Sequence, residues 1–139
     1  MGFLALGGFA GGISFVVDRT GAGLGAKRSW LEPTPVNDFL LPGLFILGVF
    51  GLASVILMAG LTWSPSPGPL RRMDTRIGVH WSWAGTIAVG AVLIAWILYE
   101  LAIISDRIVL QPILIVVGAL MVAIPLLPSM RRQFATRSR

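Results

Sequence analysis

Four long apolar stretches, separated by polar segments, dominate the chain. They cover approximately residues 2–17, 39–62, 81–104 and 108–127. Each is close to the roughly 20 residues that an α-helix needs to cross the hydrocarbon core of a bilayer. The first is the shortest and lacks a basic segment before it, so we expect a retained helix rather than a cleaved signal peptide. The pattern predicts an all-α membrane protein, a single domain over residues 1–139 built as a four-transmembrane-helix bundle.

The composition supports lipid as the main solvent of this surface. Hydrophobic residues make up 55% of the chain and charged residues 12%, with a mean hydropathy of +0.84. A soluble domain carries about 25% charged residues. The chain has no cysteine, which excludes disulfides, thiolate metal sites and cysteine nucleophiles.

The basic residues predict how the chain is oriented. If there are four spans, one side of the membrane carries seven basic residues: Arg71, Arg72, Arg76, Arg131, Arg132, Arg137 and Arg139. The other side carries four: Arg19, Lys27, Arg28 and Arg107. Cytoplasmic flanks retain Lys and Arg, so we predict that both termini are cytoplasmic. The net charge of +5 is therefore an orientation signal, and nucleic acid is not an expected partner.

The first connection, residues 18–38, contains several glycines and prolines and is expected to form no long regular element. Its middle holds Leu24, Trp30 and Leu31, which suggests that it rests on the membrane interface or on a partner. Aromatic residues also lie near the ends of the apolar stretches, among them Trp96 and Tyr99 toward the outer end of the third, as expected for headgroup-level rings.

Glu100 is the ionisable residue that falls inside a predicted span. A short turn between the third and fourth spans brings it toward Gln111. The structural interpretation is that Gln111, backbone N–H groups at the start of the fourth span, or Arg107 stabilises the carboxylate.

The functional interpretation places Glu100 in an outward-facing polar pocket. There it binds a proton or a ligand together with Tyr99, Gln111, and either Asn37 or Asp38. An intramembrane acid costs a few kcal/mol to insert and for that reason often marks a functional site.

Gly7, Gly8, Gly11 and Gly12 form two overlapping G-x-x-x-G patterns in the first span. Such a stripe lets a second helix approach closely. The helix that uses it belongs either to the same bundle or to another subunit.

His80 lies at the start of the third span beside Trp81. Haem ligation by two histidines would need a second histidine from another chain, so an interfacial histidine is the simpler interpretation. No catalytic constellation, metal site or bound cofactor is predicted.

Two short segments, NDFLLPGLF at residues 37–45 and LQP at residues 110–112, resemble small four-helix integral membrane proteins of actinobacteria and related bacteria. The resemblance implies four spans and a bacterial plasma membrane. It transfers no catalytic residue.

These patterns favour a non-enzymatic accessory or assembly subunit of a larger bacterial membrane complex. Its partners would be membrane lipids and one or more larger integral membrane proteins. The alternative is a small transporter or channel component that uses Glu100. A weaker alternative is a quinone- or haem-associated membrane subunit that uses His80 or the Glu100 pocket.

Overall fold

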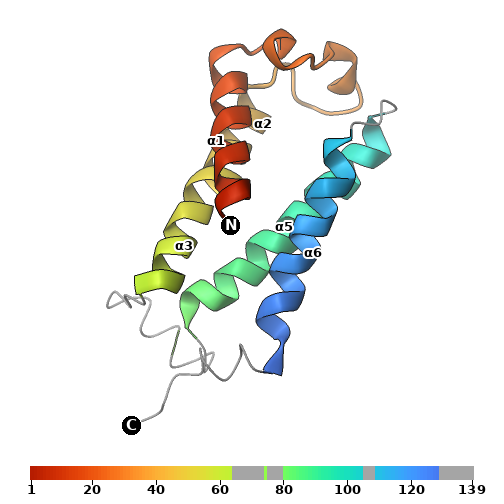
Figure 1. Ribbon diagram of the computed structural model, residues 1–139. Helices are drawn as coiled ribbons and strands as arrows, with labels where there is room; N and C mark the ends of the chain where they lie inside the picture. Colours follow the sequence, from red (N-terminus) through yellow and green to blue (C-terminus); the bar gives the residue numbers. More distant parts are fainter. Residues whose placement is uncertain (64–73, 75–79, 105–108, 129–139) are drawn as a thin grey trace.

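A computed structural model describes residues 1–63, 74, 80–104 and 109–128, and over these residues the fold is all-helical (Figure 1). The chain begins with α1 (Gly2–Val17). A connection with two 3₁₀ turns, η1 (Ala22–Leu24) and η2 (Arg28–Trp30), follows. The next helix has three parts, α2 (Leu40–Phe45), the π-helical η3 (Ile46–Leu52) and α3 (Ala53–Trp63). The last two helices are α5 (Trp81–Ile103) and α6 (Leu110–Leu126).

Two of these helices are long and apolar enough to cross a membrane. They are the continuous helix Leu40–Trp63, with 24 residues, and Trp81–Ile103, with 23. The helices Gly2–Val17 and Leu110–Leu126 are also apolar but shorter, with 16 and 17 residues. All four coincide with the apolar stretches identified in the sequence, and their ends differ from those stretches by at most two residues. The arginines of the 63–80 connection and the C-terminal tail, and Arg107, lie outside the described residues.

The helix α1 packs tightly against the π-helical segment of its neighbour. A Cβ atom added at Gly8 would lie 2.3 Å from the backbone nitrogen of Gly51, and one added at Gly12 would lie 2.7 Å from the Cα of Leu47. Only hydrogen atoms fit between the two backbones at these points. Glycine at this spacing therefore holds the first pair of helices together by close backbone packing.

The helices α5 and α6 form a second pair that uses the same device. Gly90 of α5 faces Gly118 of α6, and a Cβ atom on Gly90 would approach the Gly118 carbonyl oxygen to 3.0 Å. Nearer the other end of this pair, the Trp83 indole N–H donates a 2.9 Å hydrogen bond to the carbonyl of Pro125.

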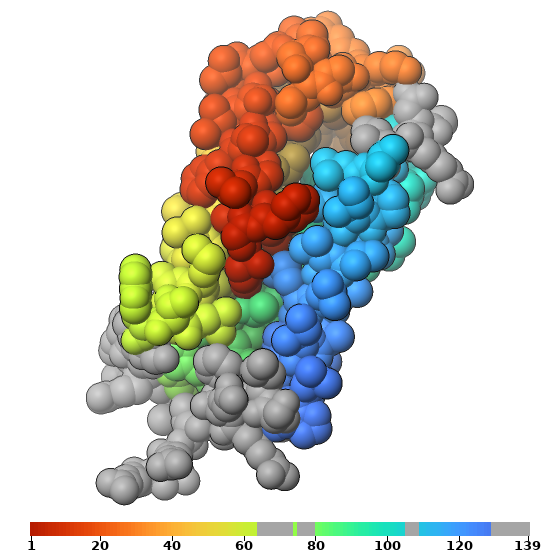
Figure 2. Space-filling model, viewed as in Figure 1, coloured from red at the N-terminus to blue at the C-terminus, as the bar shows by residue number. Residues whose placement is uncertain are grey.

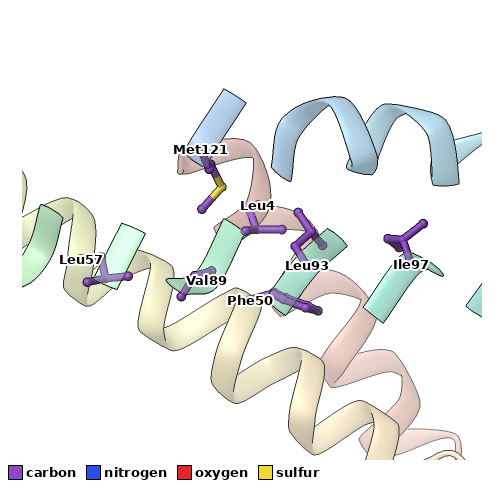
Figure 3. Packing of buried hydrophobic residues seen from close by; sticks show 7 residues of the cluster. All are labelled: Leu4, Phe50, Leu57, Val89, Leu93, Ile97 and Met121. Atoms are coloured by element: carbon purple, nitrogen blue, oxygen red, sulfur yellow. The ribbon is translucent and has the colours of Figure 1, made fainter. Parts of the chain in front are cut away.

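The two pairs meet where α3 crosses the start of α5. Gly60 leaves room for the Trp81 ring, and Gly85 leaves room for Leu57. From this contact the pairs diverge toward the end that carries residues 18–39 (Figure 1). The buried core draws side chains from both pairs, as Figure 3 shows: Leu4, Phe50, Leu57, Val89, Leu93, Ile97 and Met121.

The 18–39 connection folds back over the end of α1. The Phe39 N–H donates to the Arg19 carbonyl at 3.0 Å, and the Phe39 ring stacks on Phe15 with centroids 5.0 Å apart. Gly21 adopts a positive φ of 75°, a conformation that costs glycine little. The connection therefore has defined local structure, although the sequence predicted no long regular element in it.

Candidate functional site

A cleft of about 770 Å³ occupies the space where the two helix pairs diverge. Its walls come from α1, α2 and η3 on one side and from α5 and α6 on the other, and the 18–39 connection covers one end. Figure 2 shows the surface hollowed between α1 and the start of α6, below this connection. A cleft of this volume falls within the usual range of small-molecule sites, about 300–1,000 Å³.

The lining is almost entirely apolar and rich in aromatic rings. The aromatic members are Phe3, Phe15, Trp30, Phe39, Phe45, Phe50, Trp96 and Tyr99. Leu24 and Leu31 of the 18–39 connection also line the cleft. These side chains, interpreted from the sequence as resting on the membrane interface or on a partner, thus form part of the cleft's cover.

Glu100 is the one charged side chain among the described residues that line the cleft. The Trp96 indole N–H, one helical turn earlier in α5, donates a 2.6 Å hydrogen bond to Glu100 Oε1. The buried Gln111 side chain of α6 lies near the same carboxyl group and lines the same cleft. The structure thus brings together Glu100 and Gln111, as the short turn between the third and fourth spans led us to expect.

Aromatic contacts hold this polar cluster in place. The Phe45 ring, from the other helix pair, stacks on Trp96 with centroids 4.8 Å apart and an interplanar angle of 24°. Phe45 also makes an edge contact with Phe50, at 5.6 Å. Tyr99 lies beside Trp96, with ring centroids 6.4 Å apart, and is 49% exposed. Because Trp96 is fixed by Phe45, the carboxyl group that accepts its N–H is fixed as well.

Asp38, which the sequence placed with Glu100 in a polar pocket, has a different position. Its Oδ1 accepts the Leu40 N–H at 3.0 Å, and it does not belong to the lining of the cleft. A short acid side chain satisfies an N–H group at a helix start in this way because that group has no helical partner. Asn37 is exposed and also lies outside the lining.

The four glycines of α1 divide into two pairs with different surroundings. Gly8 and Gly12 are buried against η3. A Cβ atom on Gly7 would meet nothing within 4 Å, and one on Gly11 would meet only Ile46 Cγ2, at 3.9 Å. Both Gly7 and Gly11 line the cleft. The stripe therefore serves packing inside the bundle on one side and widens the cleft on the other.

His80 is the residue that precedes α5, and its role there is local. Its Nδ1 lies 2.6 Å from the Ser82 hydroxyl, while Asp74 accepts the Trp81 N–H at 2.6 Å. Along α5, His80 is 20 residues from Glu100, which corresponds to about 30 Å of helix. In the part of the chain that the structure describes, no three His, Asp or Glu side chains come together as metal ligands would.

Sequence reasoning missed three parts of this site: the covering role of Trp30 and Leu31, the contact of Phe45 with Trp96, and the hydrogen bond from Trp96 to Glu100. The spacing of Trp96 and Glu100 by four residues was a usable signal, because such pairs face each other on a helix.

The chain matches no protein-family model, no curated protein and no solved structure. Its function is therefore inferred from the cleft itself.

Proposed function

We propose that this chain is a non-enzymatic, multi-pass protein of a bacterial plasma membrane that binds an apolar membrane molecule in the cleft between its two helix pairs. Glu100 anchors the polar end of that molecule. The supporting observation is the position of this carboxyl group: it is the one charged side chain among the described lining residues of an otherwise apolar cleft.

The membrane arrangement in this proposal has four spans, with both termini cytoplasmic. The shorter helices α1 and α6, with 16 and 17 residues, rise about 24–26 Å at 1.5 Å per residue, near the lower limit for a span.

The absence of native cysteine allows single introduced cysteines to report which side of the membrane each position faces. We expect cysteines at Ser29 and at Ser138 to react with impermeant maleimide from opposite faces. Labelling of both from one face would overturn the four-span arrangement.

We favour ligand binding in the cleft over docking of another subunit on the glycine stripe, because Gly8 and Gly12 already pack against η3 within the chain. An intramembrane carboxyl group is costly, and such groups commonly mark ligand or ion sites. Here Glu100 faces a space of ligand size, with an aromatic hydrogen-bond donor on one side and an amide on the other. This arrangement suits binding, because Glu100 is the one charged side chain among the described residues that line the cleft.

A direct test is to identify what the purified protein carries. The wild-type protein and two variants are purified in mild detergent, and bound small molecules are extracted and measured by mass spectrometry. Gly7→Leu fills the cleft from α1, where the added side chain meets open space. Gly48→Leu is the matched control, because it also points to open space but lies outside the lining.

We expect at least one apolar molecule to be enriched over bulk lipid in the wild-type protein and in Gly48→Leu, and to be lost from Gly7→Leu. Equal extraction from all three folded proteins would overturn the proposal. Circular dichroism and size-exclusion chromatography establish that each variant is folded.

A second candidate function is the accessory-subunit role, and the exposed alanines of α5 favour it. Ala88, Ala91 and Ala95 lie on the helix surface with spacings of three and four residues, and all three are exposed. Small residues in this pattern suit close approach of a helix from a larger membrane protein. Ala91→Phe should then abolish copurification of that protein without changing what the cleft retains. Recovery of the wild-type chain alone in endogenous pull-downs would overturn this role.

A further inference from the structure

We propose that the molecule bound in the cleft is a quinol or quinone with an apolar side chain, its ring held beside Trp96 and one of its oxygens paired with Glu100. This inference rests on the proposed function and names the class of ligand. Four features of the cleft support it: the position of the polar groups at one end, the aromatic surroundings of that end, the hydrogen-bonding groups there, and the charge of the cleft.

The polar groups are confined to one end of the cleft. Glu100 and Gln111 lie near the C-terminus of α5 and the N-terminus of α6. Leu93, which lines the cleft further along α5, is seven residues from Glu100, or about 10 Å of helix rise. From Leu93 to the end of the cleft farthest from Glu100, the described walls are apolar. A ligand that fits this distribution has a small hydrogen-bonding head and an apolar tail.

The head lies among aromatic rings. Trp96 and Phe45 stack at 4.8 Å, and Tyr99 and Trp30 belong to the same lining. Aromatic rings favour offset or edge contacts with other flat rings at centroid distances of about 4.5–7 Å. A planar head group gains these contacts on several sides, whereas the hydroxyl end of a simple alkyl chain does not. The surroundings therefore select for a ring.

The hydrogen-bonding groups match both redox forms of such a ring. A quinol hydroxyl donates to the Glu100 carboxylate, and a quinone carbonyl accepts from the Gln111 amide. A charge-assisted bond to a carboxylate is roughly twice as strong as a neutral one, so the quinol should bind more tightly than the quinone. The proposal concerns binding and includes no electron transfer.

The charge of the cleft disfavours a phospholipid head. The described lining contains one carboxyl group and no lysine, arginine or histidine. A phosphate brought beside Glu100 in these apolar surroundings would have no cation to compensate its charge, and its desolvation would be costly. An uncharged head avoids this cost.

The test uses the purified full chain in lipid nanodiscs prepared without quinone. Three probes are titrated separately: a decyl-substituted benzoquinone, its quinol kept reduced under an inert atmosphere, and decanol. Binding is measured by tryptophan fluorescence quenching for the ring probes, because Trp30 and Trp96 line the cleft. For all three probes, the amount retained by the protein-containing nanodiscs at equilibrium is also measured by chromatography.

We expect saturable quinol binding, weaker quinone binding, and little retention of decanol above the level of empty nanodiscs. Glu100→Gln should weaken quinol binding about tenfold while changing quinone binding much less, since it removes the charge but keeps an oxygen acceptor. Gly7→Leu should abolish binding of both, whereas Gly48→Leu should leave it unchanged.

Three results would count against these proposals: the first overturns the ligand class, the second the role of Glu100, and the third both proposals. If decanol is retained as well as the quinol, and Gly7→Leu removes both, the cleft binds apolar molecules without preference for a ring; the proposed function stands and the quinone class is wrong. If Glu100→Gln leaves the quinol affinity unchanged in a folded protein, the carboxyl group is not the anchor. If none of the probes binds and no native molecule is enriched on purification, both proposals are wrong.

Discussion

The Trp96 indole N–H donates a 2.6 Å hydrogen bond to Glu100 Oε1 one turn further along α5. The Trp96 ring is itself stacked on Phe45 of the other helix pair. The carboxyl group is thus coupled, through one indole, to the contact between the two pairs. A change at Trp96 should therefore affect both the stability of the bundle and the position of Glu100.

Trp96→Phe separates the hydrogen bond from the stack, because phenylalanine still offers a ring to Phe45. We expect it to lower the free energy of unfolding by about 1–2 kcal/mol, the cost of a hydrogen bond to a charged or buried group. Reversible unfolding in mixed detergent micelles, followed by circular dichroism, measures the difference. Trp63→Phe is the control, since Trp63 is 79% exposed and its replacement should change stability by less than about 0.5 kcal/mol. Equal losses in the two variants would contradict the role given to the N–H group.

Leucine substitutions at two neighbouring glycines of the α1 stripe should differ greatly in their effect on stability. A side chain at Gly8 would collide with the Gly51 backbone, where the Cβ distance is 2.3 Å, whereas one at Gly7 meets nothing within 4 Å. We expect Gly8→Leu to destabilise the fold by about 3 kcal/mol or more, because backbone cannot move aside as a flexible side chain does. Gly7→Leu should unfold at nearly the wild-type denaturant concentration. If the two variants were equally stable, the packing of α1 on η3 would be wrong.

The Asp38 side chain should affect stability and leave the ligand unaffected. Asp38→Ala removes the acceptor of the Leu40 N–H and is expected to cost about 1 kcal/mol of unfolding free energy. Asp38→Asn keeps a side-chain oxygen and should recover most of that loss. Quinol affinity, measured in nanodiscs on the folded variants, should match the wild-type value. A tenfold weaker quinol affinity in Asp38→Asn would mean that Asp38 belongs to the ligand site after all.

The four long helices and their approximate ends could be predicted from the sequence, because the length and hydropathy of the apolar stretches indicate them. The pairing of Glu100 with Gln111 was also predictable, since a short turn between two long apolar stretches brings their ends together. The environment of the glycines was not. Gly7 and Gly8 are adjacent in sequence but about 100° apart around a helix, and the sequence alone does not show which of these faces a neighbouring helix covers.

The π-helical segment and the cover of the cleft were unpredictable for different reasons. A π-helix differs from an α-helix in its backbone hydrogen bonds, which join residues five apart instead of four. The segment Ile46–Leu52 contains only apolar residues and glycine, so its hydrophobic pattern does not distinguish the two kinds of helix. Trp30 and Leu31 are apolar residues that would suit a membrane interface equally well, and their place in the lining of the cleft depends on how the 18–39 connection folds back. In both cases the missing information was tertiary.

The cover of the cleft should also respond to acid through Asp18. The Thr20 hydroxyl donates to Asp18 Oδ1 at 2.6 Å, and the backbone N–H groups of Gly23 and Thr20 donate at 2.9 and 3.0 Å. These bonds, the Thr20 hydroxyl first, lower the pKa of the Asp18 carboxyl below its ordinary value of 3.8. A carboxyl group whose pKa is depressed in the folded state stabilises that state above its unfolded pKa and loses this effect as pH falls through the folded pKa.

The local structure around Asp18 should therefore be unchanged from neutral pH down to about pH 4, and should loosen below the ordinary pKa of 3.8. Nuclear magnetic resonance of the Asp18 carboxyl carbon and the Gly23 amide, recorded against pH in detergent, follows this change. Thr20→Val removes the strongest of the bonds and should raise the Asp18 midpoint toward 3.8. Asp18→Asn should abolish the pH step in the Gly23 amide. A midpoint at or above 3.8 in the wild-type protein would mean that the Thr20 and Gly23 bonds do not persist in solution.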